Sequence, residues 1–321
     1  MRLKYHHGRH THVTEADAFG KVAVLFGGNS SEREISLRSG QAVLAALRRR
    51  GVDAEAFDPQ DLPLSQLIER GIERVWIALH GPGGEDGSLQ GALEFMGLPY
   101  TGSGVTGSAV GMDKLLCKRL AEAVGVATSP YMQIDGPDDF DAVVETLGLP
   151  LIVKPATQGS SVGMTRVTQA EQLAEAFASA AAFEPRVFAE RWINGPEYTV
   201  AILQGEALPA IRIEAAGGFY DYQAKYFRTD TRYLIPCGLS APAEQHLQQL
   251  ALASFDACSA GGWGRVDFMA DDAGRPMLLE INTVPGMTDH SLVPKAALAN
   301  GIDFDELVWR VLETSFAREP R

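Results

Sequence analysis

Four polar side chains near the C-terminal end of the sequence are of the types that hold a metal ion beside a phosphate. Arg265 and Asp267 alternate with apolar residues, and so do Glu280 and Asn282. A turn signal at residues 271–274 separates the two pairs, so the stretch predicts a β-hairpin. Because successive side chains of a strand point to opposite faces, each strand presents its polar pair on one face.

Two carboxylates and an amide oxygen are hard donors suited to Mg²⁺, whose coordination is usually completed by water and substrate phosphates. The hairpin therefore predicts a metal–phosphate site formed by Asp267, Glu280 and Asn282. The alternative is a buried ion pair of Arg265 with Asp267 or Glu280, since burying these groups unpaired would be costly.

The composition limits the classes of function. A length of 321 residues suits two or three domains, and 45% hydrophobic and 21% charged residues are typical of a globular protein. The net charge of −13 argues against a nucleic-acid partner, so a phosphate ligand should be small and locally bound. We expect no membrane partner, because no transmembrane run or signal-peptide core is present. Three cysteines without metal-ligand spacing indicate a reducing cytoplasm.

The first third of the chain predicts a parallel sheet with helical crossovers. Strands are expected over residues 22–26, 52–57 and 74–79 and helices over 34–50 and 64–70. Ligands bind beyond the carboxyl ends of such strands, where Glu32 and His80 fall. Glu32 could receive a substrate ammonium or simply favour a helix N-terminus, and His80 could contact substrate or tie down a loop.

Two lysines of the central part could bind phosphate. Lys114 lies in the first turn of a helix expected over residues 112–125, where an exposed lysine gains little from the helix dipole. Lys154 ends a strand that precedes a loop containing Ser160 and Ser161, whose backbone N–H groups and hydroxyls could close on phosphates. An ordinary hairpin with a solvated lysine is the alternative.

Residues 102–107 match the G-x-G-x-x-G pattern, but no credible strand precedes them. We therefore expect a loop between domains at these residues.

The remaining elements provide a candidate nucleotide pocket. Further strands are expected over residues 131–134, 151–154, 164–167, 197–203 and 208–213, and further helices over 138–147, 170–182, 244–260, 291–300 and 304–316. The apolar segment 187–193 could flank an adenine ring, and Glu197 could bind ribose hydroxyls. The aromatic and charged loop that starts at residue 220 is long enough to act as a lid.

From about residue 20 onward the chain resembles the D-alanine:D-alanine ligases of the ATP-grasp superfamily. The segments that carry the resemblance are 26–36, 78–81, 83–87, 112–114, 153–155, 159–163, 219–222, 224–226, 264–267, 280–283 and 285–288. So many motifs in order are highly specific.

The resemblance implies an α/β and α+β protein with the ATP-grasp fold, in which an N-terminal parallel-sheet α/β domain is followed by two domains that clamp ATP. The implied divisions are a flexible arm (1–20), a substrate-binding domain (21–104), a central subdomain (105–195) and a catalytic subdomain (196–321). ATP would phosphorylate a first D-alanine, and the amine of a second would attack the acyl phosphate to give D-alanyl-D-alanine. A homodimer is also implied.

The resemblance also implies roles for individual residues. Asp267, Glu280 and Asn282 would hold two Mg²⁺ or Mn²⁺ ions, and Arg265 with the Gly286 N–H would stabilise the oxyanion. The implied ATP contacts are Lys114, Lys154, Ser160, Ser161, Glu190, Arg191, Trp192, Ile193, Glu197, Lys225 and Asn282.

The implied substrate contacts come from separate parts of the chain. Glu32 would bind the first D-alanine ammonium near His80, and Ser291 with the lid, including Lys225, would hold the second carboxylate. Tyr226, Ser160 and Glu32 form the implied hydrogen-bonded group that orients the substrates, without the base being identified. Relatives that make D-alanyl-D-lactate commonly carry Phe at the position of Tyr226, so tyrosine favours an amine nucleophile.

Three other functions fit parts of the sequence. An ATP-grasp ligase with another second substrate, such as D-lactate, is disfavoured by Glu32, Ser160 and Tyr226. A non-catalytic nucleotide-binding module would be expected to have lost Arg265 or a metal ligand, and none is lost. A dinucleotide-dependent oxidoreductase rests only on the weak glycine match.

Overall fold

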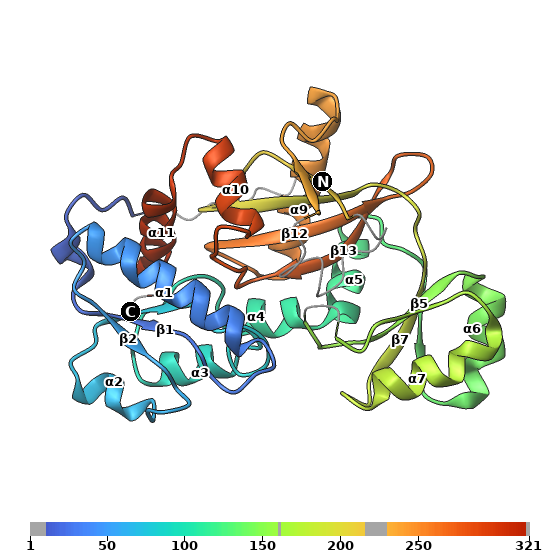
Figure 1. Ribbon diagram of the computed structural model, residues 1–321, viewed down its shortest axis with the longest axis horizontal. Coiled ribbons are helices and arrows are strands. Elements are labelled where there is room, and N and C mark those ends of the chain that lie inside the picture. The colour runs from blue at the N-terminus through green and yellow to red at the C-terminus, as the bar shows by residue number, and fades with distance from the viewer. Residues whose placement is uncertain (1–10, 160–161, 216–229, 319–321) are drawn as a thin grey trace.

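The computed structural model describes residues 11–159, 162–215 and 230–318 and forms three sheets with helices around them (Figure 1). Ser160, Ser161, Lys225 and Tyr226 lie outside these residues, as does most of the expected lid. Within them, no helix combines the length and apolar character needed to cross a bilayer.

The N-terminal sheet is parallel, with the order β2-β1-β3. Its strands are β1 (Val22–Leu25), β2 (Ala54–Phe57) and β3 (Arg74–Ile77), and its helices are α1 (Arg33–Arg49), α2 (Ser65–Glu69) and α3 (Ser88–Phe95). Every residue of β1 and β3 is buried, as continuous apolar runs between helical layers require. The expected parallel sheet is confirmed.

Two helices from the far end of the chain complete the core of this sheet. They are α10 (Leu292–Ala299) and α11 (Phe304–Glu313), whose apolar residues share one hydrophobic cluster with β1 and β3. The Trp76 indole N–H donates to the Val308 carbonyl at 3.4 Å. The C-terminal segment is thereby anchored beside the strands that carry Glu32 and His80 at their ends.

Residues of the expected N-terminal arm also pack on α11. The backbone N–H of Val13 donates to Glu313 at 2.8 Å, and Phe19, in the 3-10 helix Ala16–Phe19, meets Trp309 edge-on with ring centroids 4.8 Å apart. Both Val13 and Phe19 are buried.

The second sheet is antiparallel, with the order β4-β7-β5-β6. Its strands are β4 (Tyr131–Ile134), β5 (Leu151–Pro155), β6 (Thr165–Val167) and β7 (Val187–Arg191). Helices α6 (Phe140–Leu147) and α7 (Leu173–Ala181) cover one face, with the 3-10 turns Pro137–Asp139 and Ala170–Gln172 before them (Figure 1). Val153 and Ala189 pack under these helices, so the alternation of strand side chains turns Lys154 and Glu190 to the other face.

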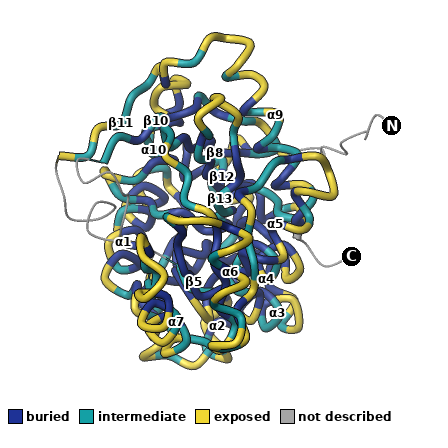
Figure 2. Tube along the Cα trace, turned by 90° about the vertical axis from the view of Figure 1, so that its right-hand side faces the viewer, coloured by how far each residue is buried: buried dark blue, intermediate teal, exposed yellow. Residues whose placement is uncertain are grey.

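The third sheet has six strands, with the path β11-β10-β8-β12-β13 and β9 paired to β8. The strands are β8 (Glu197–Leu203), β9 (Glu206–Ala207), β10 (Ile211–Glu214), β11 (Arg232–Leu234), β12 (Trp263–Ala270) and β13 (Pro276–Asn282). Helices α5 (Lys114–Ala123) and α9 (Ala241–Ala257) share its hydrophobic cluster. Figure 2 shows the tube almost wholly buried through β8 and β12, whereas β13 alternates between buried and intermediate residues. The 3-10 segment Thr314–Arg318 follows α11.

One expectation near residue 110 is wrong. The loop expected over residues 102–107 ends at Gly104, because α4 (Val105–Met112) begins at Val105. The helix expected over residues 112–125 is confirmed as α5 and starts after Asp113, which has extended backbone angles and caps α5 by accepting the Leu116 N–H at 3.0 Å. The break at Asp113 sets the direction of α5 and hence of Lys114.

Candidate active site

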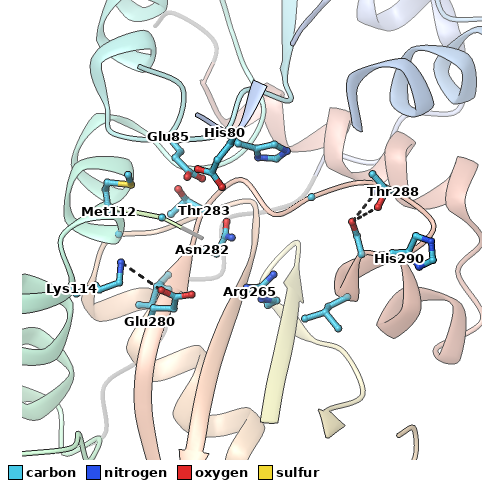
Figure 3. A pocket seen from close by; sticks show the side chains of 17 residues that line it. His80, Glu85, Met112, Lys114, Arg265, Glu280, Asn282, Thr283, Thr288 and His290 are labelled. Atoms are coloured by element: carbon cyan, nitrogen blue, oxygen red, sulfur yellow. Dashed lines mark hydrogen bonds and ion pairs between the residues drawn. The ribbon is translucent and has the colours of Figure 1, made fainter. Parts of the chain in front are cut away.

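A cleft that is open to solvent lies where the N-terminal sheet, α5 and the β12–β13 hairpin meet (Figure 3). The residues lining it are Glu32, His80, Glu85, Gly111, Met112, Lys114, Gly159, Arg265, Glu280, Ile281, Asn282, Thr283, Gly286, Thr288, His290, Ser291 and Leu292. Segments distant in sequence therefore supply carboxylates, cations and a glycine backbone to one space.

The hairpin has the arrangement that its alternating pattern predicts. Arg265 pairs with Asn282 across the strands, and Asp267 pairs with Glu280, with a bulge directly after Asp267. The Arg265 guanidinium donates to both carboxylate oxygens of Asp267, at 2.8 and 2.7 Å, and Thr199 donates to the same carboxylate at 2.6 Å. The ion pair considered as the alternative is thus present in the structure.

This ion pair is compatible with a metal site. A carboxylate has about four lone-pair positions, so Asp267 keeps acceptor capacity beside Arg265 and Thr199. Glu280 is partly exposed, with Lys114 Nζ 3.6 Å from its Oε2, and Asn282 accepts the Val284 N–H at 3.1 Å. Among the described residues, no group of three His, Cys, Asp or Glu side chains is placed to hold a metal ion. The candidate ligands are therefore the two carboxylates of Asp267 and Glu280 together with the amide of Asn282.

The opposite wall carries buried titratable groups. Glu32 is the N-cap residue of α1 and is 6% exposed. The His80 ring nitrogens contact the Val284 carbonyl at 2.9 Å and the Ser39 hydroxyl at 3.3 Å, and burial lowers the pKa of His80. These contacts tie the His80 loop to α1 and to the segment after β13, in keeping with the alternative to a substrate role.

Glu85 is a cleft residue that the sequence analysis missed. Its carboxyl accepts the Gly81 N–H at 2.9 Å, and it lies beside His80 in Figure 3. Burial, and then the nearby charge of Glu32, raise the pKa of Glu85 to about 8. The feature of the sequence that could have indicated a site residue here is the position of Glu85 in a glycine-rich segment, residues 81–87, directly after a predicted strand.

The loop after β5 reaches Glu32. A Cβ added at Gly159 would lie 3.0 Å from Glu32 Oε2, so glycine permits the close approach. The Lys114 ammonium donates to the Gln158 carbonyl at 2.6 Å and therefore contacts the same loop. Glu32 and Lys114 are thus joined by the loop that continues into Ser160.

The nucleotide candidates cluster beside this cleft, around β5 and β7. Lys154 forms an ion pair with Glu190, whose second oxygen lies 2.6 Å from Lys118. The charges of Lys118 and Lys154 outweigh burial and lower the pKa of Glu190 to about 2. Lys118 was also missed, because a lysine on a helix normally faces solvent.

The other nucleotide candidates lie at the end of β7 and in the segment after it. The Arg191 guanidinium donates to the Leu147 carbonyl at 2.8 Å, away from the cleft. The Trp192 ring has Arg166 4.4 Å from its centroid, and its N–H donates to Asn194 at 2.7 Å. Ile193 is half-buried, and Glu197 begins β8.

Gly286 and Ser291 lie together at the other end of the cleft. The Ser291 hydroxyl accepts the Thr288 N–H at 2.9 Å and contacts the Thr288 hydroxyl at 3.0 Å, at the start of α10. A Cβ at Gly286 would come within 2.9 Å of the Ser291 hydroxyl. The structure therefore brings Glu32, His80, Lys114, Arg265, Glu280, Asn282, Gly286 and Ser291 into one cleft.

Comparison with known families gives matches over most of the chain. The family described as "D-ala D-ala ligase C-terminus" matches residues 120–313, and that described as "D-ala D-ala ligase N-terminus" matches residues 55–103. A D-alanine–D-alanine ligase of Alkalilimnicola ehrlichii is 57% identical over 305 residues, which cover 95% of this chain and 97% of the relative.

Two solved structures share the whole fold. The D-alanine–D-alanine ligase of Bacillus anthracis complexed with ATP has a TM-score of 0.80 and 32% identity, covering 93% of this chain and 98% of its own. The VanG D-Ala:D-Ser ligase of Enterococcus faecalis has a TM-score of 0.79 and 28% identity, covering 92% and 99%. The expected fold is confirmed by these likenesses.

Proposed function

The chain belongs to the D-alanine–D-alanine ligase family, and on that premise we propose that it joins two D-alanine molecules with ATP to give D-alanyl-D-alanine, ADP and phosphate. One observation carries the proposal: a single cleft joins a buried acid for an ammonium, Glu32, to Lys114, Arg265 and Glu280, which suit phosphate chemistry. The dipeptide is a peptidoglycan precursor, and we place the enzyme in the cytoplasm, where ATP is available.

In the first step, a carboxylate oxygen of one D-alanine attacks the γ-phosphorus of ATP. The bond from this phosphorus to the bridging oxygen breaks, ADP leaves and D-alanyl phosphate forms. Glu32 pairs with the ammonium of this D-alanine, because a buried carboxylate at the cleft wall favours a cationic partner. Lys114, and Lys154 beyond it, offset the charge of the transferring phosphoryl group.

In the second step, the amine of the second D-alanine attacks the carbonyl carbon of D-alanyl phosphate. The carbonyl oxygen takes up negative charge and then reforms the double bond as the bond to phosphate breaks, while the amine gives up a proton. Arg265 and the Gly286 N–H stabilise the oxyanion from the cleft wall. Ser291 with Lys225 holds the second carboxylate, and Glu32, Ser160 and Tyr226 orient the two substrates.

Asp267, Glu280 and Asn282 would hold two Mg²⁺ or Mn²⁺ ions. Their hard oxygens and adjacent cross-strand positions fit such ions. When bound, such ions would offset the negative charge that builds up during phosphoryl transfer. We assign the remaining ATP contacts to Ser160, Ser161, Lys225 and the segment from Glu190 to Ile193, with Glu197 on the ribose.

A homodimer is the assembly we propose, through the apolar ends of α3 and α4. Phe95 is 95% exposed and Val105 is 37% exposed. A Cβ at Gly91, one turn before Phe95, would lie 3.8 Å from Val105, so the two helices are neighbours there. Sedimentation of the wild type and of Phe95→Glu tests this face: a dimer unaffected by the substitution would place the interface elsewhere.

The activity is tested by phosphate release from ATP with Mg²⁺. The arms contain no amino acid, D-alanine, L-alanine, or D-alanine with D-lactate or D-serine, and mass spectrometry identifies the product. We expect release to require D-alanine and to yield its dipeptide. Release only with another acceptor would keep the nucleotide site but refute the assignments of Glu32, Tyr226 and Ser291. D-Serine is included because VanG, which shares the fold, is a D-Ala:D-Ser ligase.

A further inference from the structure

Lys118 is a buried lysine that the proposed reaction does not use. It lies on α5, one turn after Lys114, and is 0% exposed. Burying an ammonium costs several kcal/mol unless paired groups compensate. Burial lowers the pKa of Lys118, and the charge of Glu190 opposes that effect.

The partners of Lys118 come from both sheets that flank α5 (Figure 1). Its ammonium lies 2.6 Å from Glu190 Oε2 on β7, and it donates to the Leu278 carbonyl on β13 at 3.4 Å. The Tyr131 ring of β4 lies 5.7 Å away. Lys118 therefore connects the four-stranded sheet to the hairpin strand that also carries Glu280.

Glu190 is shared between two lysines. One oxygen faces Lys118 and the other contacts Lys154, and the carboxylate is 2% exposed. The three groups together carry one net positive charge. Without Lys118, Glu190 and Lys154 would form a neutral pair. Glu190 would then neutralise the charge of Lys154, which would no longer be available to an anionic ligand.

We propose that Lys118 is a positioning residue of the nucleotide site, which neutralises and orients Glu190 so that Lys154 keeps its charge for the phosphates of ATP. The inference rests on the proposed function. Lys118 itself is shielded behind Glu190 and makes no contact with solvent, so it acts through its neighbours and is not a catalytic residue. A purely structural lysine would be replaceable by an apolar side chain of similar length without a selective effect on ATP.

The test compares Lys118→Met with Arg119→Met, which changes an exposed residue of the same helix. KM for ATP and for D-alanine, kcat and binding of Mg-ADP without D-alanine are measured, with folding checked by circular dichroism. We expect Lys118→Met to raise KM for ATP and Kd for Mg-ADP at least tenfold and to change KM for D-alanine less than threefold. Lys118→Gln, which keeps a donor to Glu190 without the charge, replaces Lys118→Met if the latter does not fold.

A double mutant then tests whether Lys118 acts through Glu190. In a Glu190→Gln background, Lys118→Met should change nucleotide binding less than threefold, because no carboxylate remains to capture Lys154. Equal losses in both backgrounds, or equal rises of both KM values, would overturn the proposal. Nucleotide binding is measured without turnover, so a wild type that binds Mg-ADP but makes no dipeptide would refute only the proposed function.

Discussion

Glu85 offers a test of the cleft that needs no substrate. It is 9% exposed, and burial together with the charge of Glu32 raises its pKa to about 8 from an ordinary value of 4.5. The Gly81 N–H bond and the Lys114 charge oppose this rise without cancelling it. The folded, ligand-free protein therefore holds a proton on Glu85 at neutral pH that the unfolded chain has lost.

The sign of the effect on stability follows from proton binding. Between pH 4.5 and about 8 the folded state binds more protons at this group than the unfolded state, so the free energy of unfolding falls as pH rises. Above that window the penalty is complete and constant. At about 1.36 kcal/mol per pKa unit, the rise from 4.5 to about 8 corresponds to roughly 5 kcal/mol. Because Glu32 contributes, this amount belongs to the interacting carboxyls together.

The assay is urea unfolding from pH 5 to pH 9 in EDTA without nucleotide, on the wild type, Glu85→Gln and the exposed control Glu69→Gln. Glu85→Gln should match the wild type near pH 5 and exceed its unfolding free energy by several kcal/mol at pH 8.5. The Glu69→Gln curve should run parallel to that of the wild type. Parallel curves for Glu85→Gln as well would refute the reasoning that Glu85 is held neutral.

Three substitutions test the proposed chemistry. Arg265→Ala should lower kcat by on the order of 10² or more, since it removes an oxyanion donor, while ATP binding stays measurable by titration; near-normal turnover would remove that role. Glu280→Gln should abolish activity at ordinary Mg²⁺ concentrations in a metal titration, and retained activity would exclude Glu280 as a ligand. Tyr226→Phe should raise the use of D-lactate relative to D-alanine, most at low pH where the amine is protonated; competition assays showing an unchanged ratio would contradict the specificity argument.

The hairpin could be predicted because its information is local. Alternation with period two and a turn signal predict which side chains share a face of each strand. The cross-strand pairs, Arg265 with Asn282 and Asp267 with Glu280, were not predicted and come from the register that the structure shows. The parallel N-terminal sheet was predictable for a similar reason, since apolar runs and glycine turns recur at regular spacing. The domain boundaries expected near residues 104 and 195 stay predictions. Helices α10 and α11, which follow the second boundary in the sequence, share a hydrophobic cluster with the N-terminal sheet.

The residues that the sequence did not reveal owe their burial to contacts between distant parts of the chain. Lys118 has no local sign of burial, because its partners Glu190 and Leu278 lie far along the chain. Glu85 is buried by the path of a glycine-rich loop, which no periodicity encodes. The break at Asp113 is different: an aspartate is a preferred N-cap, and its capping bond to Leu116 could have marked the start of a new helix.

The charge balance of the cleft fits the divalent ions that we propose for the hairpin. Among the described lining residues, the carboxyls of Glu32, Glu85 and Glu280 face the cations of Lys114 and Arg265, and Arg265 is already paired with Asp267. With Glu85 protonated and Arg265 paired with Asp267, one negative charge of the lining remains uncompensated, so this wall by itself does not attract a polyanion such as ATP. Two Mg²⁺ ions between the hairpin acids and the phosphates would reverse that balance. Lys118 would act in the same direction at Lys154, by leaving one more positive charge available to the nucleotide.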